Sequence, residues 1–389
     1  MFKLNLTKKK VFGKLLGAYC LMTLLAPAVF FNKLLFIAVF VLSFKTIASG
    51  VTRQTGCTPL VVMAIFFYGF LLSFLTNSDQ GLAVQFVLVA ALGFLIEPIK
   101  AYKIDLDELF ISLLKYFVVF SLFFFYITVI NRDVVSDEAR NILTGLGKSA
   151  SASKDYFADD SVFVAALSTV PWIFIPWCIL VARLRRGFDF SVVFWLLMSS
   201  LVILISGRRA LIVVSLFFLV GYLLWTGPNI IRVALVSLLI LGLGDLVVFL
   251  KDETYIFSLN DESNSVKIGH LASFVEQLGV SQFIFGHGLA SYYHSAGVGE
   301  LIAHTELTPI DSFRYFGVPL SLLLYGAIVL RGLPMSYEVG SAWRALSFLL
   351  YLILSCSNPV LFNSYGMLVV LWYWSTRRGD SGKSGTRVN

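Results

Sequence analysis

Apolar segments of about twenty residues recur from one end of the chain to the other, with short polar stretches between them. A helix of that length crosses a hydrocarbon core of about 30 Å. Lipid offers no hydrogen-bond partners, so the backbone groups of such segments must pair within helices. The pattern therefore predicts an all-α polytopic membrane protein. A β-barrel is disfavoured, because its strands would alternate polar and apolar residues over about half that length.

The pattern predicts about twelve spans within a single transmembrane domain that covers residues 1–389. Lys45 interrupts the second span, and two short spans folded as a re-entrant hairpin would also keep the total even. The first span is predicted to be a retained anchor, because the small-residue pattern of a cleavage site is weak. The polar tail at 376–389 is predicted to be disordered. The spans are 12–31, 34–52, 58–76, 81–99, 109–130, 162–182, 189–206, 210–226, 230–250, 313–331, 341–357 and 359–375.

Composition agrees with this class of protein. Hydrophobic residues make up 58% of the chain and charged residues 14%, with a mean hydropathy of +0.84, whereas soluble domains are about 25% charged. The basic residues behind the net charge of +7 mostly flank apolar segments, which indicates topology signals rather than a nucleic-acid partner. The cysteines are isolated and predict neither a disulfide framework nor a metal site; they are Cys20, Cys57, Cys178 and Cys356.

Lysine and arginine in short loops predict the orientation. With the N-terminal lysine cluster in the cytoplasm, both termini and most basic loops lie on that side. The outer side then holds Asn77–Gln80, Asn131–Ser161, a large loop at 251–312 and the turn Ser357–Pro359. All four histidines of the chain fall in the loop at 251–312. The titratable groups therefore gather on one predicted face of the membrane.

One predicted outer turn opposes the charge rule. Arg208 and Arg209 lie in the sequence Ser-Gly-Arg-Arg-Ala between two apolar runs. Arginine at mid-membrane depth costs about 2.5–3.5 kcal/mol on the insertion scale, and less near the surface. Either these side chains extend to the lipid headgroups, or they face a polar cavity that holds an anionic ligand.

The two long outer loops differ in character. Asn131–Ser161 carries mixed charges, which is typical of a solvated surface and, less often, of a substrate lid. The first half of the 251–312 loop has apolar residues at helical spacing and predicts a helix on the outer surface. Those residues are Ile268, Leu271, Ala272, Phe274, Val275 and Leu278.

The second half of this loop carries the candidate chemistry. Two glycines around His287 predict a tight backbone turn close to another part of the protein. If Pro309 opens a helix, Asp311 and Arg314 lie one turn apart on one face. They form either a simple surface ion pair or a base beside a phosphate-binding cation. A metal bound by His287, His294 and His304 is the least favoured alternative, because no tight ligand spacing supports it.

These residues resemble those of bacterial O-antigen polymerases of the Wzy type, which belong to a wider group of membrane polysaccharide polymerases and O-antigen ligases. Three segments carry the resemblance: the Ser206–Arg209 turn, the Phe285–Gly288 run with Ser291 and Tyr292 after it, and the block Glu306–Pro319. They occur in the family's order and cover about a third of the chain.

The resemblance implies a fold like that of the helical GT-C membrane glycosyltransferases and an active site at the periplasmic face of the inner membrane. It implies transfer of a glycan from undecaprenyl pyrophosphate onto the next carrier-linked repeat unit, with no cofactor and with a chain-length regulator as a candidate partner. Guanidinium groups match phosphate oxygens well. The implied substrate-binding residues are Arg208, Arg209, Arg314, His287 and Tyr292.

The chain departs from the ligases of this group at one position. Ligases carry a His-Asn pair about eleven residues before the glycine that matches Gly317, where this chain has Glu306, with His304 two residues earlier. The departure favours a polymerase over a ligase. A carboxylate near apolar surface can have a raised pKa suited to deprotonating a sugar hydroxyl. We therefore predict Glu306 as the catalytic base, with Asp311 and His304 as the next candidates.

Two alternatives stay open at this point. One is the sister O-antigen ligase, which transfers the finished glycan to lipid A–core. The other is a multi-span transporter or flippase of lipid-linked sugars, which the number of spans would suit. Transporters tend to place ionisable residues at the bilayer midplane. Here Lys45, Glu97 and Asp245 are the few candidates, and most of them lie near the predicted ends of spans.

Overall fold

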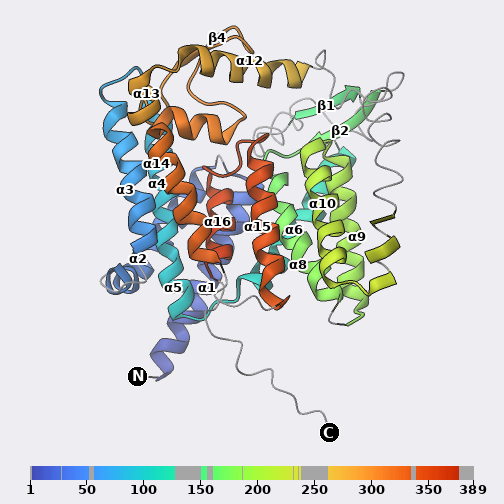
Figure 1. Ribbon diagram of the computed structural model, residues 1–389. Coiled ribbons are helices and arrows are strands. Elements are labelled where there is room, and N and C mark those ends of the chain that lie inside the picture. Colours follow the sequence, from blue (N-terminus) through green and yellow to red (C-terminus); the bar gives the residue numbers. More distant parts are fainter. Residues whose placement is uncertain are drawn as a thin grey trace.

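The computed structural model describes residues 2–27, 29–51, 57–127, 150–155, 161–185, 187–230, 232–234, 236–237, 262–333 and 339–375. These residues are mostly helical, and Figure 1 shows most of the helices running side by side as a bundle. Within the described residues, five helical segments are long and apolar enough to cross a membrane: Phe30–Gly50, Gln80–Ala101, Leu106–Phe125, Arg209–Thr226 and Thr308–Gly332. The predicted span at 230–250 lies mostly outside the described residues, and the tail at 376–389 lies wholly outside them.

The helices of the bundle follow the predicted apolar segments. In the first half of the chain they are α1 (Phe2–Leu25), α2 (Phe30–Val51), α3 (Cys57–Ser73), α4 (Gln80–Ala91), which continues through a 3₁₀ turn into α5 (Ile96–Ala101), and α6 (Leu106–Phe125). In the second half they are α8 (Phe174–Leu184), α9 (Phe190–Ile205), α10 (Arg209–Thr226), α14 (Thr308–Gly332), α15 (Val339–Ser355) and α16 (Ser364–Trp374).

Short polar residues set where several helices begin. The side chain of Asp79 accepts a hydrogen bond from the backbone N–H of Leu82 at 3.0 Å and caps α4. Asp105 caps α6 and Asn363 caps α16 in the same way. Such caps satisfy backbone N–H groups that have no partner inside the helix. In these three cases a capping residue in the sequence marks the helix start.

Two predicted spans begin later in the structure than predicted. The span predicted at 162–182 begins with a strand, because β2 (Ser161–Ala166) pairs antiparallel with β1 (Ala150–Asp155). Its helical part begins only at Val170, with Pro171 in the first turn. The span predicted at 359–375 begins only at Ser364, so α16 is about 16 Å long and shorter than a bilayer core. Its predicted first residues instead form an irregular, largely buried segment.

The mostly helical structure agrees with the all-α prediction, and the loop of residues 251–312 adds a short hairpin that was not predicted. This loop contains helix α12 (Glu262–Gln277), the short helix α13 (Val280–Phe285), and a hairpin of β3 (Tyr293–Ser295) and β4 (Glu300–Ile302). These elements lie over one end of the bundle (Figure 1). The strands are only three residues long, too short for their alternation to stand out in the sequence.

Helix α14 is broken at Gly317, whose φ of 75° and ψ of 164° are not helical. The part before Gly317 lies across the end of the bundle, whereas the part after it runs along the bundle (Figure 1). This break separates a short polar helix, which carries Asp311 and Arg314, from an apolar helix that is long enough to enter lipid.

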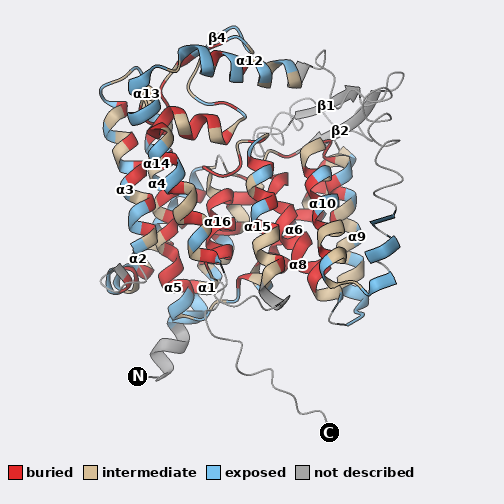
Figure 2. Ribbon diagram, in the orientation of Figure 1, coloured by how far each residue is buried: buried red, intermediate tan, exposed pale blue. Residues whose placement is uncertain are grey.

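The interior of the bundle is apolar and rich in aromatic side chains. Trp172, Trp372 and Trp374 are among the largest fully buried residues, and buried positions line the inner faces of the helices (Figure 2). Many large apolar residues on the outward faces, such as Phe123 and Phe190, are exposed instead. Apolar side chains on both the inner and the outer faces are expected of helices that face lipid.

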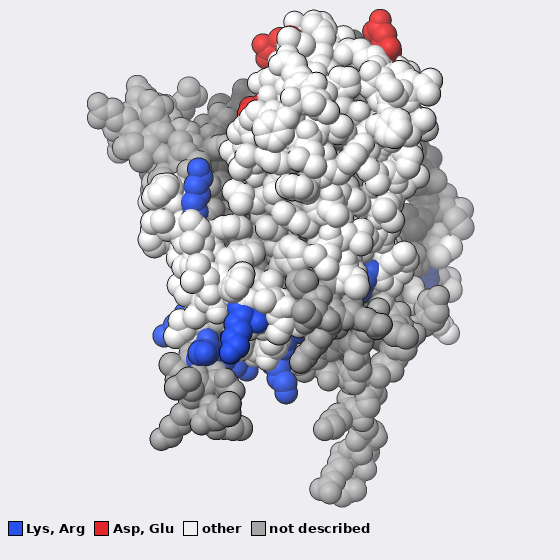
Figure 3. All heavy atoms as spheres, turned by 90° about the vertical axis from the view of Figure 1, so that its left-hand side faces the viewer, with Lys and Arg blue, Asp and Glu red and all other residues white. Residues whose placement is uncertain are grey.

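Charged side chains gather at the two ends of the bundle. On the face shown in Figure 3, Lys and Arg cluster toward the lower end, and Asp and Glu appear at the upper end, above α3. Partly buried ion pairs also lie at the lower end. Arg344 pairs with Asp107, which accepts a further hydrogen bond from the indole N–H of Trp372 at 2.7 Å. Arg331 lies 3.5 Å from Glu97.

Candidate functional site

The candidate site forms where two loops, far apart in the sequence, meet at the upper end of the bundle. The backbone N–H of Tyr292 donates to the carbonyl of Asn77 at 2.8 Å, and that of Asp79 donates to the carbonyl of Ala290 at 3.0 Å. Ser78 and Ser291 form an isolated β-bridge. The loop between α3 and α4 therefore fixes the segment that follows His287.

The glycines around His287 are needed for close backbone packing, as the sequence predicted. Gly286 has a φ of 77°, and a Cβ built on it would lie 2.5 Å from the carbonyl oxygen of Tyr315. Gly288 has a φ of 90°, and its Cβ would lie 2.6 Å from the backbone nitrogen of Ser73. No side chain fits at those distances, and positive φ disfavours other residues. The run is thus clamped between α14 and α3.

The break in α14 supplies the hydrogen bonds that hold this run. Pro319 has no N–H, so the carbonyl of Tyr315 has no partner four residues along the helix. The non-helical Gly317 likewise leaves the carbonyl of Arg314 open. The backbone N–H groups of His287 and Gly288 fill these places, at 2.7 Å to Arg314 and 3.1 Å to Tyr315. The local sequence of α14 therefore leaves two backbone carbonyls open, and the segment around His287, called here the histidine loop (Phe285–Gly288), binds to them.

Asp311 is the centre of the site and is only 1% exposed. One carboxylate oxygen lies 2.9 Å from Nη2 of Arg314. The other lies 2.9 Å from Nδ1 of His304 and accepts the backbone N–H of Thr305 at 2.9 Å. The predicted pairing of Asp311 with Arg314 is therefore present, with Pro309 in the first turn of the helix. The pair is buried rather than on the surface.

Two aromatic rings and several hydrogen bonds fix the side chain of Arg314. Its guanidinium lies between the rings of Tyr293 and Tyr315, 4.3 Å and 4.8 Å from their centroids. It donates to the carbonyl of Ser291 and, at 2.8 Å, to that of Ala303. These contacts join both ends of the β3–β4 hairpin region to α14. Most of the donors of Arg314 thus serve the fold, and its charge is balanced by Asp311.

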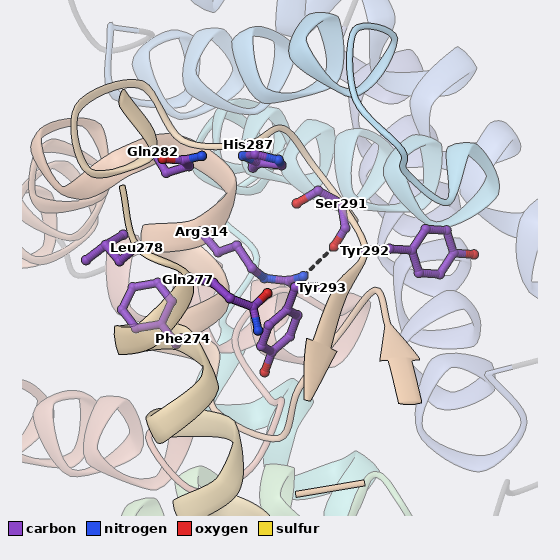
Figure 4. A pocket seen from close by; sticks show the side chains of 9 residues that line it. All are labelled: Phe274, Gln277, Leu278, Gln282, His287, Ser291, Tyr292, Tyr293 and Arg314. Carbon is purple, nitrogen blue, oxygen red and sulfur yellow. Dashed lines mark hydrogen bonds between the residues drawn. The ribbon is translucent and has the colours of Figure 1, made fainter. Parts of the chain in front are cut away.

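A cavity of about 80 Å³ opens beside Arg314 (Figure 4). Burial and the nearby charge of Arg314 lower the pKa of His287. Burial also raises the pKa of Tyr293 to about 12, so both side chains are neutral near pH 7. The cavity is lined by Phe274, Gln277, Leu278, Gln282, His287, Ser291, Tyr292, Tyr293 and Arg314.

Arg208 reaches the same end of the bundle from α10. Its Nη1 donates to the side-chain oxygen of Asn358 at 2.7 Å, and the hydroxyl of Thr308 donates to the backbone carbonyl of Asn358 at 3.3 Å. Asn358 therefore connects the turn Ser206–Arg209, called here the arginine turn, to the start of α14. Arg209 is the first residue of α10 and is partly exposed. Sequence reasoning missed Asn358, although an Asn-Pro pair between two apolar runs was the available signal.

Glu306, the favoured base at the sequence level, lies outside the buried cluster. Its side chain is 54% exposed, and the nearest cation is Nζ of Lys267 at 3.8 Å. His304 is less exposed, at 37% of its side chain, and is bonded to Asp311. Of the three predicted catalytic residues, the structure joins His304 to Asp311 and leaves Glu306 at the surface beside them.

Helix α12 exists as predicted, but its polar face is the one that packs inward. His270 and Ser273 are buried. Nδ1 of His270 lies 2.6 Å from the hydroxyl of Ser295, and the hydroxyl of Ser273 accepts the N–H of Ala296 at 2.8 Å. The predicted apolar residues are divided, because Phe274 and Leu278 line the cavity, whereas Ile268, Leu271 and Val275 are exposed.

Among the residues that the structure describes, no group of three or more histidine, cysteine or acidic side chains has the arrangement of a metal site. In comparisons with known proteins, no protein-family model and no curated protein matches this chain. Any assignment of function therefore rests on the geometry of the site and on the sequence resemblance.

Proposed function

We propose that this protein is a membrane glycosyltransferase that polymerises carrier-linked oligosaccharide units, in the manner of O-antigen polymerases. The observation that carries the proposal is the pairing of His304 with the buried Asp311 at 2.9 Å. It lies beside the loop of His287 and at the end of the bundle where Arg208 reaches Asn358. The three sequence segments that resemble the family thus meet at one end of the bundle.

The His304–Asp311 pair suits general-base catalysis. With its Nδ1–H donated to Asp311, His304 accepts a proton at Nε2. In the proposed reaction, an acceptor sugar hydroxyl gives its proton to His304 and its oxygen attacks the anomeric carbon of the donor. The bond from that carbon to the pyrophosphate oxygen breaks, and the pyrophosphate leaves with the electron pair. Asp311 stabilises the imidazolium that forms.

Geometry favours His304 over Glu306 as the base. A base that is held by a second, buried group keeps its orientation, which general-base catalysis requires. Glu306 is half exposed, and solvent screens its charge and its ion pair with Lys267. Asp311 is too deeply buried to meet a bulky glycan and serves best as the group that orients His304.

The arginine turn is the proposed pyrophosphate site. Leaving phosphate gains negative charge in the transition state, and guanidinium groups stabilise it. Arg208 is positioned by Asn358, and Arg209 follows it at the first position of α10, where the helix dipole also favours an anion. Arg314 remains in the proposed substrate-binding set through its place in the cavity wall.

The charge distribution supports a periplasmic site in a bacterial inner membrane. Basic residues gather at the end of the bundle opposite the candidate site (Figure 3), and cytoplasmic loops carry an excess of lysine and arginine. Both termini would then be cytoplasmic. A carrier lipid that is anchored in the outer leaflet would present its pyrophosphate at the level of the arginine turn.

A deletion strain tests the function. Loss of a polymerase leaves surface lipid A–core with a single repeat unit, whereas loss of a ligase removes all O-chain; both are read on a polysaccharide gel. An unchanged ladder of long chains would contradict the proposal. Purified protein in liposomes, supplied with carrier-linked repeat units, separates the flippase alternative, because a flippase moves the substrate without elongating it.

A further inference from the structure

We propose that the cavity beside Arg314 is a subsite for one uncharged sugar ring of the glycan substrate. This inference rests on the proposed function and deepens it, because it names the chemistry that the site recognises. The sugar held there is a neighbour of the reacting sugar and not the reacting sugar itself, because His304 does not line the cavity.

Two buried polar groups in the cavity wall lack a partner within the protein. The hydroxyl of Ser291 and the Nε–H of Arg314 make no hydrogen bond, although their residues are 0% and 6% exposed. Buried polar groups are nearly always paired, and an unpaired one in a cavity points to a ligand that completes it. Both groups can donate, so the ligand must offer acceptor oxygens.

The charged groups of the cavity wall are already balanced, which favours a neutral ligand. Asp311 neutralises Arg314 at 2.9 Å, and burial together with Arg314 keeps His287 unprotonated near neutral pH by lowering its pKa. The remaining wall has no acidic or basic side chain. A phosphate or a uronate would bring a negative charge with no cation left to balance it. A sugar hydroxyl or ring oxygen supplies the acceptor without that cost.

The surface of the cavity suits a pyranose ring. Figure 4 shows the rings of Phe274 and Tyr293 on one side with the amide of Gln277 between them, and Gln282 on the opposite side. Aromatic faces pack against the C–H face of a sugar, and amides pair with its hydroxyl edge. A volume of about 80 Å³ is several times the space of a single water molecule, about 10–15 Å³.

The cavity is also connected to the proposed base. Arg314 contacts the cavity and donates to one oxygen of Asp311, whose other oxygen holds His304. A sugar bound against Arg314 would therefore be fixed relative to His304 through a single buried ion pair. Such a subsite would position the glycan and select the repeat unit that is accepted.

Saturation-transfer NMR on the purified full-length protein tests the subsite. The probes are a panel of neutral methyl glycosides, with inorganic phosphate and methyl glucuronide as charged comparisons. We expect at least one neutral glycoside to bind and the charged probes not to compete. Ser291→Ala should weaken that binding about five- to tenfold, since it removes one hydrogen bond to the ligand, and should leave the unfolding temperature unchanged, because the hydroxyl has no partner in the fold.

Ser295→Ala is the matched control. This serine is also fully buried in the same loop, but its hydroxyl lies 2.6 Å from Nδ1 of His270 and outside the cavity wall. The control should lower the unfolding temperature and leave glycoside binding unchanged. The subsite is rejected if no neutral glycoside binds, if phosphate or glucuronide binds instead, or if the two variants weaken binding equally.

The binding experiment and the test of function can fail separately. Glycoside binding that is sensitive to Ser291→Ala, in a protein that never elongates carrier-linked units, would keep a sugar site and remove the polymerase. Elongation with unchanged glycan KM in Ser291→Ala would keep the polymerase and remove the subsite.

Discussion

Asp311 contacts the proposed base His304, the guanidinium of Arg314 and the backbone N–H of Thr305, and it is almost closed to solvent. A buried carboxylate is stable there only because each oxygen has a partner. The same burial makes Asp311 a poor proton acceptor from a large substrate and a good orienting group for His304. Two of the predicted catalytic residues, placed seven positions apart in the sequence, thus become one unit in the fold.

The choice between the two candidate bases can be tested by comparing His304→Gln with Glu306→Gln. Loss of a general base lowers turnover by about 10²–10⁴-fold. We expect that loss for His304→Gln, and a change of less than about tenfold for Glu306→Gln, because Glu306 is half exposed and only loosely paired. Elongation of carrier-linked units in detergent or liposomes gives the rates. The reverse order would restore Glu306 as the base.

Asp311→Asn should damage stability as well as turnover. The change leaves Arg314 buried without its counter-charge, and breaking a buried ion pair costs about 3–5 kcal/mol. Thermal or denaturant unfolding in detergent micelles measures the loss. Glu306→Gln serves as the control, since a substitution at an exposed position changes stability by about 0.5 kcal/mol or less. Equal stability of the two variants would mean that the buried pair does not hold the site together.

Stability should also fall in mild acid because of the buried His270 and the half-buried His287. Burial lowers the pKa of His270, although the negative charges of Asp311 and Glu306 act to raise it. Burial and the positive charge of Arg314 lower the pKa of His287. The unfolded chain therefore binds protons more readily below its ordinary histidine pKa of about 6.5. Stability is full above this pH and decreases as the pH falls toward the folded-state values.

We expect the unfolding temperature to drop between pH 7.5 and pH 5.5, and the drop to be smaller in His287→Gln, which removes one of the two groups. Differential scanning fluorimetry at several pH values measures both slopes. His294→Gln is a suitable control, since this residue is exposed in the same loop. A slope identical in wild type and His287→Gln would show that His287 does not titrate differently in the two states.

At the scale of elements, two glycines decide how the histidine loop docks. Gly286 and Gly317 both have positive φ, and a Cβ on either would meet backbone atoms of the other segment, 2.5 Å and 2.4 Å away at the nearest. Backbone atoms cannot move aside as a side chain does. The loop and the break in α14 therefore act as one interlocked element.

Gly286→Ala should therefore prevent the loop from docking and cost several kcal/mol, because steric overlap adds to the strain of a positive φ. Gly299→Ala is the matched control. Gly299 has nearly the same φ, 79°, but open space around its missing Cβ, so the expected loss is only about 1–2 kcal/mol. Unfolding measurements and protease sensitivity of the loop distinguish the two. Similar losses would mean that φ alone matters.

Sequence reasoning placed most helices correctly because apolar length is a local property that lipid enforces. It also found the tight turn at His287 and the helix start at Pro309, both from local residue chemistry. It missed the hairpin of β3 and β4, the late start of α16 and the role of Asn358. These depend on contacts between distant segments, such as Arg208 with Asn358, which no local pattern contains.

For the whole molecule, the arrangement of charges makes a topology prediction. Lysine and arginine side chains cluster at one end of the bundle on the face shown in Figure 3, and the candidate site with its covering loop lies at the other end. The stretch between them is mostly apolar, with isolated lysines such as Lys115 of α6, and is the part that lipid would surround. The positive-inside rule then assigns the basic end to the cytoplasm.

Cysteine labelling of intact cells with a membrane-impermeant maleimide tests this orientation. The background replaces the exposed Cys57 and Cys356 with serine, and leaves the buried Cys20 and Cys178 in place. Glu300→Cys, in the hairpin over the site, should label from outside. Arg185→Cys, exposed just after the C-terminal end of α8, should label only after the cells are broken, because the cytoplasm lies beyond the reach of the reagent.

Labelling of both positions from the same side would contradict a bundle that crosses the membrane with the site at its outer end. Labelling of Arg185→Cys alone in intact cells would mean that the orientation of the bundle is inverted. The inverted outcome would place the proposed base and arginines where a periplasmic carrier-linked glycan cannot reach them.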